Sequence, residues 1–279
     1  MSRSDLPLLI GVLREPVYSP GRFFDADRAI LRETAKACET AGARVRILPA
    51  DAPRQAFAGA RLVFTMCQGP ESLQTMGWLA ASGVTVVHEP SAILSCHRTR
   101  MLPLLERAGI PRPEAHLVAC ADPEPETLTW AEECGETGVW VKRGDVHATQ
   151  PEDVVHLRGR EAVGSALARL ADRGVSQAVL EAHVPGRTVK FYAVRGTPFF
   201  RSYAEDEADL GPALPAWRQL AERAAAALGL AVYGGDLIVG EGEKVSLVDV
   251  NDWPSFSHCC DEAATAIAEH LFSRLDAPR

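Results

Sequence analysis

The first ninety residues alternate short apolar runs with segments whose apolar positions recur at helical spacing. The apolar runs, which predict strands, are 6–13, 45–48, 61–67 and 84–89. The segments with helical spacing are 25–41 and 71–81. Strands that alternate with helices are typical of a parallel sheet. We therefore expect an N-terminal parallel α/β lobe over residues 1–92.

Two further lobes are expected, a central one over residues 93–184 and a C-terminal one over 185–279. Their predicted strands are 138–145, 177–184, 188–194 and 197–204, and their predicted helices are 98–108, 163–170, 217–228 and 263–275. Strands 188–194 and 197–204 are separated by Arg195 and Gly196, which suit a hairpin turn. The pattern predicts an α/β protein in which two α+β lobes follow the parallel lobe.

The segment 234–256 contains two apolar strands on either side of Gly242 and Glu243. Glycine at the first central position suits a two-residue type II′ turn, which would place Asp236 opposite Asp249. Asn251 would share a face with Asp249, because side chains two apart along a strand point the same way. Carboxylate and amide oxygens suit Mg²⁺, with Mn²⁺ as an alternative. The competing interpretation is a solvated edge with no metal.

Basic residues inside apolar strands indicate an anionic ligand. Lys142 and Lys190 both have such positions, which are costly unless a negative partner is present. Arg98 at a helix start and Arg201 late in a strand are further candidates. A bound polyphosphate would supply the negative charge for all four.

Composition narrows the classes of partner. The formal net charge of -8 argues against broad contact with nucleic acid. The seven cysteines lack CxxC spacing, which argues against a zinc site or a disulfide framework. The N-terminus lacks a signal-peptide layout and no apolar run is long enough to cross a bilayer, so we expect a cytoplasmic protein without membrane contact. A dinucleotide-binding lobe is disfavoured because no GxGxxG follows the first strand.

The order of these elements resembles the ATP-grasp superfamily, in particular its ribosomal-protein glutamate ligase-like branch of carboxylate–amine ligases. The segments that carry the resemblance are HRTRMLPLLERAGIPRP (97–113), VWVKRGD (139–145), LEAHVPG (180–186), VKFYAV (189–194), GGDLIV (234–239) and LVDVNDWPSF (247–256). The resemblance implies an ATP-grasp fold in which the last two lobes clasp the nucleotide. It also implies nucleotide contacts from Arg98, Lys142, Glu181, His183 and Val184, catalytic roles for Lys190 and Arg201, and metal ligation by Asp236, Asp249 and Asn251.

The chain departs from the family pattern at three places. Arg98 stands where a lysine is usual, and Asp249 stands where glutamate is frequent. The segment after Lys142 has a single glycine where the family often has a glycine-rich phosphate loop. We expect His147 or the backbone near Asp145 to take over part of that function.

The implied activity is ATP- and Mg²⁺-dependent joining of a carboxylate to an amine through an acyl phosphate. The expected partners are small-molecule or peptide carboxylates and amines, and a homodimer is an open alternative to a monomer. A second hypothesis is a kinase, because inositol-polyphosphate kinases resemble the chain at the Asp-Val-Asn run and at Arg201 and Ser202. A third is a catalytically silent nucleotide-binding protein. Substrate contacts are expected from residues 14–23, 67–72 and 253–258.

Overall fold

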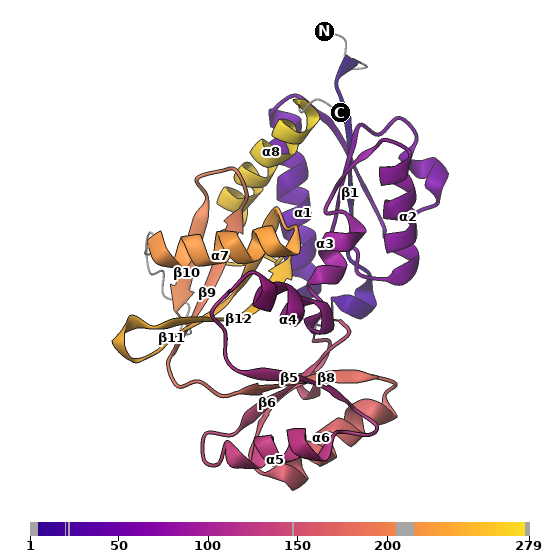
Figure 1. Ribbon diagram of the computed structural model, residues 1–279. Helices are drawn as coiled ribbons and strands as arrows, with labels where there is room; N and C mark the ends of the chain where they lie inside the picture. Colours follow the sequence, from indigo (N-terminus) through magenta and orange to yellow (C-terminus); the bar gives the residue numbers. More distant parts are fainter. Residues whose placement is uncertain (1–4, 20, 22, 147, 205–214, 277–279) are drawn as a thin grey trace.

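The computed structural model describes residues 5–19, 21, 23–146, 148–204 and 215–276. Three four-stranded sheets organise this part of the chain (Figure 1). No helix among the described residues is long and apolar enough to cross a membrane. The strands with their bounds are β1 (Leu8–Val12), β2 (Arg44–Leu48), β3 (Leu62–Thr65), β4 (Thr85–Val87), β5 (Ala115–Ala119), β6 (Val139–Arg143), β7 (Val154–Leu157), β8 (Gln177–Ala182), β9 (Arg187–Val194), β10 (Phe200–Ala204), β11 (Val232–Val239) and β12 (Val245–Asp252). The α-helices are α1 (Phe23–Thr40), α2 (Pro70–Ala81), α3 (Pro90–Ser95), α4 (Arg98–Arg107), α5 (Pro125–Glu133), α6 (Arg160–Asp172), α7 (Pro215–Leu228) and α8 (Cys260–Asp276).

The N-terminal sheet is parallel, with strand order β2-β1-β3-β4. Every residue of β1 and β3 is buried, as expected for strands with helices on both faces. The predicted parallel α/β lobe is therefore confirmed. The short helix α3 was not predicted from the pattern.

The other two sheets are antiparallel, with orders β5-β8-β6-β7 and β10-β9-β11-β12. Helices α5 and α6 cover one face of the central sheet, at the bottom of Figure 1. Helices α4 and α7 pack on one face of the C-terminal sheet. Helix α8 returns to lie along α1, so the N-terminal and C-terminal sheets share a hydrophobic core.

The hairpin of β11 and β12 differs from the predicted one. A short 3₁₀ turn, Glu241–Glu243, joins the strands, with positive φ at Gly242 and Glu243. Near this turn Val239 pairs with Val245, whereas farther along Asp236 pairs with Asp249, because a bulge shifts the register by one residue. The predicted two-residue turn is wrong. The predicted opposition of Asp236 and Asp249 is confirmed, since the bulge offsets the extra turn residue.

Candidate functional site

A cavity of about 610 Å³ lies over the C-terminal sheet, between the start of α4 and the loop that follows β1. Five of the residues singled out in the sequence line it together: Arg98, Lys190, Asp236, Asp249 and Asn251. Alternation along β9, β11 and β12 brings four of them to one face of the sheet, and Arg98 comes from the start of α4. These five residues bring two cations, two carboxylates and an amide to the cavity.

Arg98 and Asp249 form a buried ion pair in this cavity. Nη2 of Arg98 bonds to Oδ2 of Asp249, and Nη1 donates to the carbonyl oxygen of Arg143 at 3.1 Å. The side chains of Arg98 and Asp249 are only 7% and 14% exposed. The second oxygen of Asp249 accepts from the backbone N–H of Val250 at 3.1 Å. Helix α4 thus carries a cation to the acidic hairpin.

Lys190 and Asp236 form a second pair, on neighbouring strands. The two residues are directly opposite in register, and Nζ of Lys190 lies 2.8 Å from Oδ1 of Asp236. Burial alone would lower the pKa of the Lys190 ammonium, but the nearby carboxylate outweighs it and raises that pKa. Each of the two opposed carboxylates, Asp236 and Asp249, is therefore paired with a cation in this structure.

Lys142 and Glu181 form a third ion pair, between β6 and β8 of the central sheet, and both side chains are almost completely buried. Burial raises the pKa of the Glu181 carboxyl even though Lys142 opposes that shift. Neither residue is among the described residues that line the 610 Å³ cavity. A backbone bond from Thr99 to Gly144, 3.1 Å long, ties the start of α4 to the end of β6.

His183 and Val184 lie in the connection between β8 and β9. Nδ1 of His183 accepts a hydrogen bond from the Trp140 indole at 3.2 Å, and its ring lies 4.8 Å from that of His156. Burial, with His156 and Arg158 nearby, lowers the pKa of His183. The rings of His183, Trp140 and His156 form an aromatic cluster on the central lobe.

Arg201 lies on β10, directly opposite Tyr192 of β9. Its Nη2 atom is 2.5 Å from Oε2 of Glu262, near the start of α8, and Arg201 is not among the described lining residues. His147 lies outside the described residues, whereas Ala148 lines the cavity.

The expected substrate loops meet the cavity at two places. Arg14 and Tyr18 line it from the loop after β1, and Pro254, Ser255, Ser257 and His258 line it from the loop after β12. Nη2 of Arg14 donates to the carbonyl of Trp253 at 2.7 Å, which joins these two loops. Positions 20 and 22 lie outside the described residues.

The third expected loop, 67–72, contributes indirectly. Gln68 donates from Nε2 to both oxygens of the buried Asp252, at 3.0 Å each. Asp252, Asp27 and Tyr192 also line the cavity and were missed in the sequence. Strand alternation was a signal for Tyr192, which lies two residues after Lys190.

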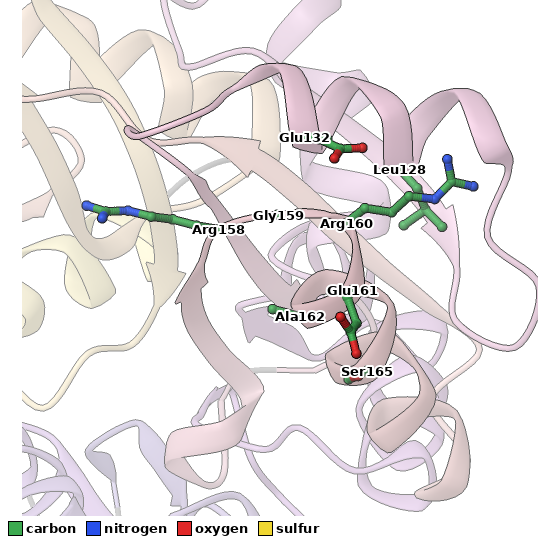
Figure 2. Close-up of a pocket in the computed structure, with 8 residues that line it drawn as sticks. All are labelled: Leu128, Glu132, Arg158, Gly159, Arg160, Glu161, Ala162 and Ser165. Carbon is green, nitrogen blue, oxygen red and sulfur yellow. The ribbon is translucent and has the colours of Figure 1, made fainter.

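A separate depression of about 850 Å³ lies between α5 and α6 on the central lobe. Figure 2 shows Arg158 and Arg160 extending from it in opposite directions, with Glu132 and Glu161 on the side of Arg160. Its described lining contains none of the candidate site residues. We therefore place the candidate site at the smaller cavity, where cations and carboxylates converge.

No protein-family model and no curated protein matches the sequence. Solved structures match its fold over nearly the whole chain. The D-alanine-D-alanine ligase from Coxiella burnetii has a TM-score of 0.74 at 13% identity, and the alignment covers 96% of both chains. An ATP-grasp RimK domain protein from Sphaerobacter thermophilus has a TM-score of 0.69 at 18% identity and covers 95% of this chain and 99% of its own.

A D-alanine-D-alanine ligase from Bacillus anthracis, solved in complex with ATP, has a TM-score of 0.71 at 12% identity. That alignment covers 97% of this chain and 98% of the ligase. The chain therefore has the ATP-grasp fold, and the fold expected from the sequence is confirmed.

Proposed function

We propose that this protein is an ATP-dependent ligase that joins a carboxylate to an amine. The observation that carries the proposal is the convergence of Arg98, Lys190, Asp236, Asp249 and Asn251 on one cavity. The match in fold to ligases supports the proposal. Because a fold alone does not determine chemistry, the charged residues of the cavity are needed to narrow the choice of reaction. The proposal places the reaction in the cytoplasm, where ATP is supplied.

The donor set fits Mg²⁺, and Mn²⁺ accepts the same ligands. Asp236 and Asp249 face each other in register, and Asn251 lines the same cavity, so two carboxylates and an amide oxygen are available. Within the described ranges, no group of three or more His, Cys, Asp and Glu side chains gathers to hold a metal. The amide and the phosphates of ATP would therefore complete the ligand set. A bound Mg²⁺ would neutralise phosphate charge.

In the proposed reaction, an oxygen of the substrate carboxylate attacks the γ-phosphorus of ATP. The bond to the β–γ bridging oxygen breaks, and ADP leaves. The amine then attacks the acyl carbon, an amide forms, and inorganic phosphate leaves with the proton that the amine releases. Arg98, Lys142 and Lys190 would hold the phosphates and stabilise the charge of the transferred group. The nucleotide base would contact the connection that holds His183 and Val184.

The substrates would enter beside the N-terminal lobe. Arg14 and Asp27 line that side of the cavity, with Nε of Arg14 3.1 Å from Oδ2 of Asp27. Charges of both signs at this position suit one substrate with a carboxylate and another with an amine. Closure of the lobes would exclude water from the acyl phosphate.

The kinase alternative rests on the resemblance at the Asp-Val-Asn run, residues 249–251, and at Arg201 and Ser202. Arg201 pairs with Glu262, and the Ser202 side chain is buried. Neither is among the described residues that line the cavity. Because Arg201 is also a candidate catalytic residue of the ligase, this arrangement does not separate the two activities.

The test is a screen of ATP turnover with paired carboxylates and amines, read by phosphate release and by mass spectrometry of the product. We expect Mg²⁺-dependent release of free phosphate together with an amide. The double variant Asp249→Ala/Asn251→Ala should lose turnover, while Arg218→Gln, an exposed change on α7, should keep it. A phosphorylated acceptor without amide would instead establish a kinase. An absence of ATP binding by the wild type would refute both activities.

A further inference from the structure

A second crevice, of about 460 Å³, lies where the N-terminal and C-terminal lobes meet. It is bounded by the end of β4, α3, the C-terminal end of α7 and one side of α8. Figure 1 shows α3 and α7 near the centre of the molecule and α8 above them. It shares no described lining residue with the candidate active site. Its basic lining residues are His88, Arg195, His270 and Arg274, and Glu89 on its rim is the one carboxylate among the described lining residues.

The two arginines of this crevice have no carboxylate partner within the described part of the chain. Arg195 donates from Nη2 to the carbonyl oxygen of Ala225 at 3.0 Å, and its other donors face no acidic side chain there. Arg274 lies one turn after His270 on α8. A guanidinium fork matches the geometry of carboxylate and phosphate oxygens. Two of them at one crevice favour an anionic ligand.

His88 has a buried donor. Its Nε2 atom accepts hydrogen bonds from the backbone N–H groups of Ala231 and Val232, at 2.8 and 2.9 Å. The ring proton must therefore sit on Nδ1, which has no hydrogen-bond partner among the described atoms. His88 is only 3% exposed and its Nδ1 atom is itself buried, so this unmet donor is a cost to the fold and does not open to a ligand in the crevice.

His270 lies in the same positively charged surroundings. Its side chain is 8% exposed, and its Nδ1 atom lies 2.9 Å from the carbonyl oxygen of Arg195. Burial lowers the pKa of His270, and the charges of Arg274 and Arg195 lower it further. An anion in the crevice would relieve the repulsion among these groups.

We propose that this crevice binds a small oxyanion between Arg195 and Arg274, which both line it. Phosphate and carboxylate share the required chemistry, which is an oxygen-rich, negatively charged group. The site is separate from the proposed ligase centre, so its test does not depend on ligase activity.

The experiment is calorimetric titration of inorganic phosphate, and separately of succinate, into the full chain. Arg274→Gln should weaken anion binding at least tenfold, and Arg195→Gln/Arg274→Gln should abolish it. Arg218→Gln is the control, since that arginine lies on α7, is partly exposed, pairs with Glu222 and does not line the crevice, and it should stay within twofold of wild type. Because Arg195 also bonds to the backbone of α7, the single Arg274 variant carries the test if the double variant does not fold.

Binding of only one of the two anions supports the site and identifies whether it prefers a phosphate or a carboxylate. Phosphate held at the nucleotide site would persist in Arg274→Gln, so the difference between wild type and this variant isolates the crevice. Unchanged affinity in folded Arg274→Gln protein would overturn the proposal. Failure of the wild type to bind either anion at millimolar concentration would overturn it as well.

Discussion

At the scale of single residues, the candidate site is a set of opposite charges that neutralise one another. Arg98 with Asp249 is nearly inaccessible to water, whereas Lys190 with Asp236 is 47% and 27% exposed. Breaking a buried pair leaves an uncompensated charge, while breaking an exposed pair leaves a charge that water solvates. The two pairs therefore make different contributions to stability although both face one cavity.

Asp249→Asn should lower the free energy of unfolding by about 3 kcal/mol, because the Arg98 guanidinium would remain buried without a countercharge. Asp236→Asn is the matched change at the exposed pair and should cost about 1 kcal/mol or less. Urea denaturation of both variants measures the difference. Equal losses would show that the burial of the Arg98 pair does not govern its stability.

His88 should make the protein less stable in mild acid. Burial lowers its pKa from 6.5 to about 4, so between these values the unfolded chain takes up a proton that the folded protein does not. The free energy of unfolding should therefore fall as the pH decreases through this window, by roughly 3 kcal/mol in total.

The measurement is urea denaturation at pH values from 7.5 to 4 for the wild type and His88→Gln. The glutamine oxygen can still accept from Ala231 and Val232, and this variant should lose that part of the pH dependence. Ile30→Val, a core change without a titratable group, should keep the slope of the wild type. A wild-type slope in His88→Gln would contradict the assignment.

At the scale of elements, alternation along the strands predicted much of the site. The period of two placed Asn251 with Asp249, and both line the cavity. The opposition of Asp236 and Asp249 was predicted from a turn that the chain does not use. Nothing local in the pattern indicates the bulge near Val248 that restores this register. The type of turn and the presence of a bulge could not be predicted separately. The hydrophobic pattern constrained only the strand register that the two produce together.

The ion pairs were beyond local prediction. Arg98 and Asp249 are 151 residues apart in sequence, and their contact depends on how α4 crosses the C-terminal sheet. Lys142 was expected to need a negative partner, which is Glu181 on the neighbouring strand. Each residue was identified from burial and charge, but the pairing is a property of the tertiary structure.

Gly235 tests how tightly the acidic hairpin is packed. A Cβ at this position would lie 2.2 Å from the carbonyl oxygen of Asp249 and 2.8 Å from the Phe191 ring. Gly235→Ala should therefore cost about 2 kcal/mol or more and weaken ATP binding. Gly164→Ala in α6 is the control, since its Cβ would meet nothing within 4 Å, and it should stabilise the helix by about 0.5–1 kcal/mol. Thermal denaturation that shifts in the same direction for both would contradict this interpretation.

At the scale of the whole molecule, the hydrophobic cores do not each correspond to one of the three sheets. Trp253 and helix α8 belong to one core with α1 and β3, so the first and last parts of the chain are packed together. The central sheet with α5 and α6 has a core of its own. This division would allow the central lobe to move as a unit when the proposed nucleotide binds.

Two matched core truncations test that division. Ile267 of α8 and Leu167 of α6 are both fully buried, and replacing either with alanine should cost about 3 kcal/mol. In hydrogen exchange, Ile267→Ala should lower protection in β1 and β9 but spare β6 and β8, because local stability follows the core to which an element belongs. Leu167→Ala should show the reverse pattern. If either variant lowered protection equally in all four strands, the chain would unfold as one cooperative unit and the central lobe would have no independent stability.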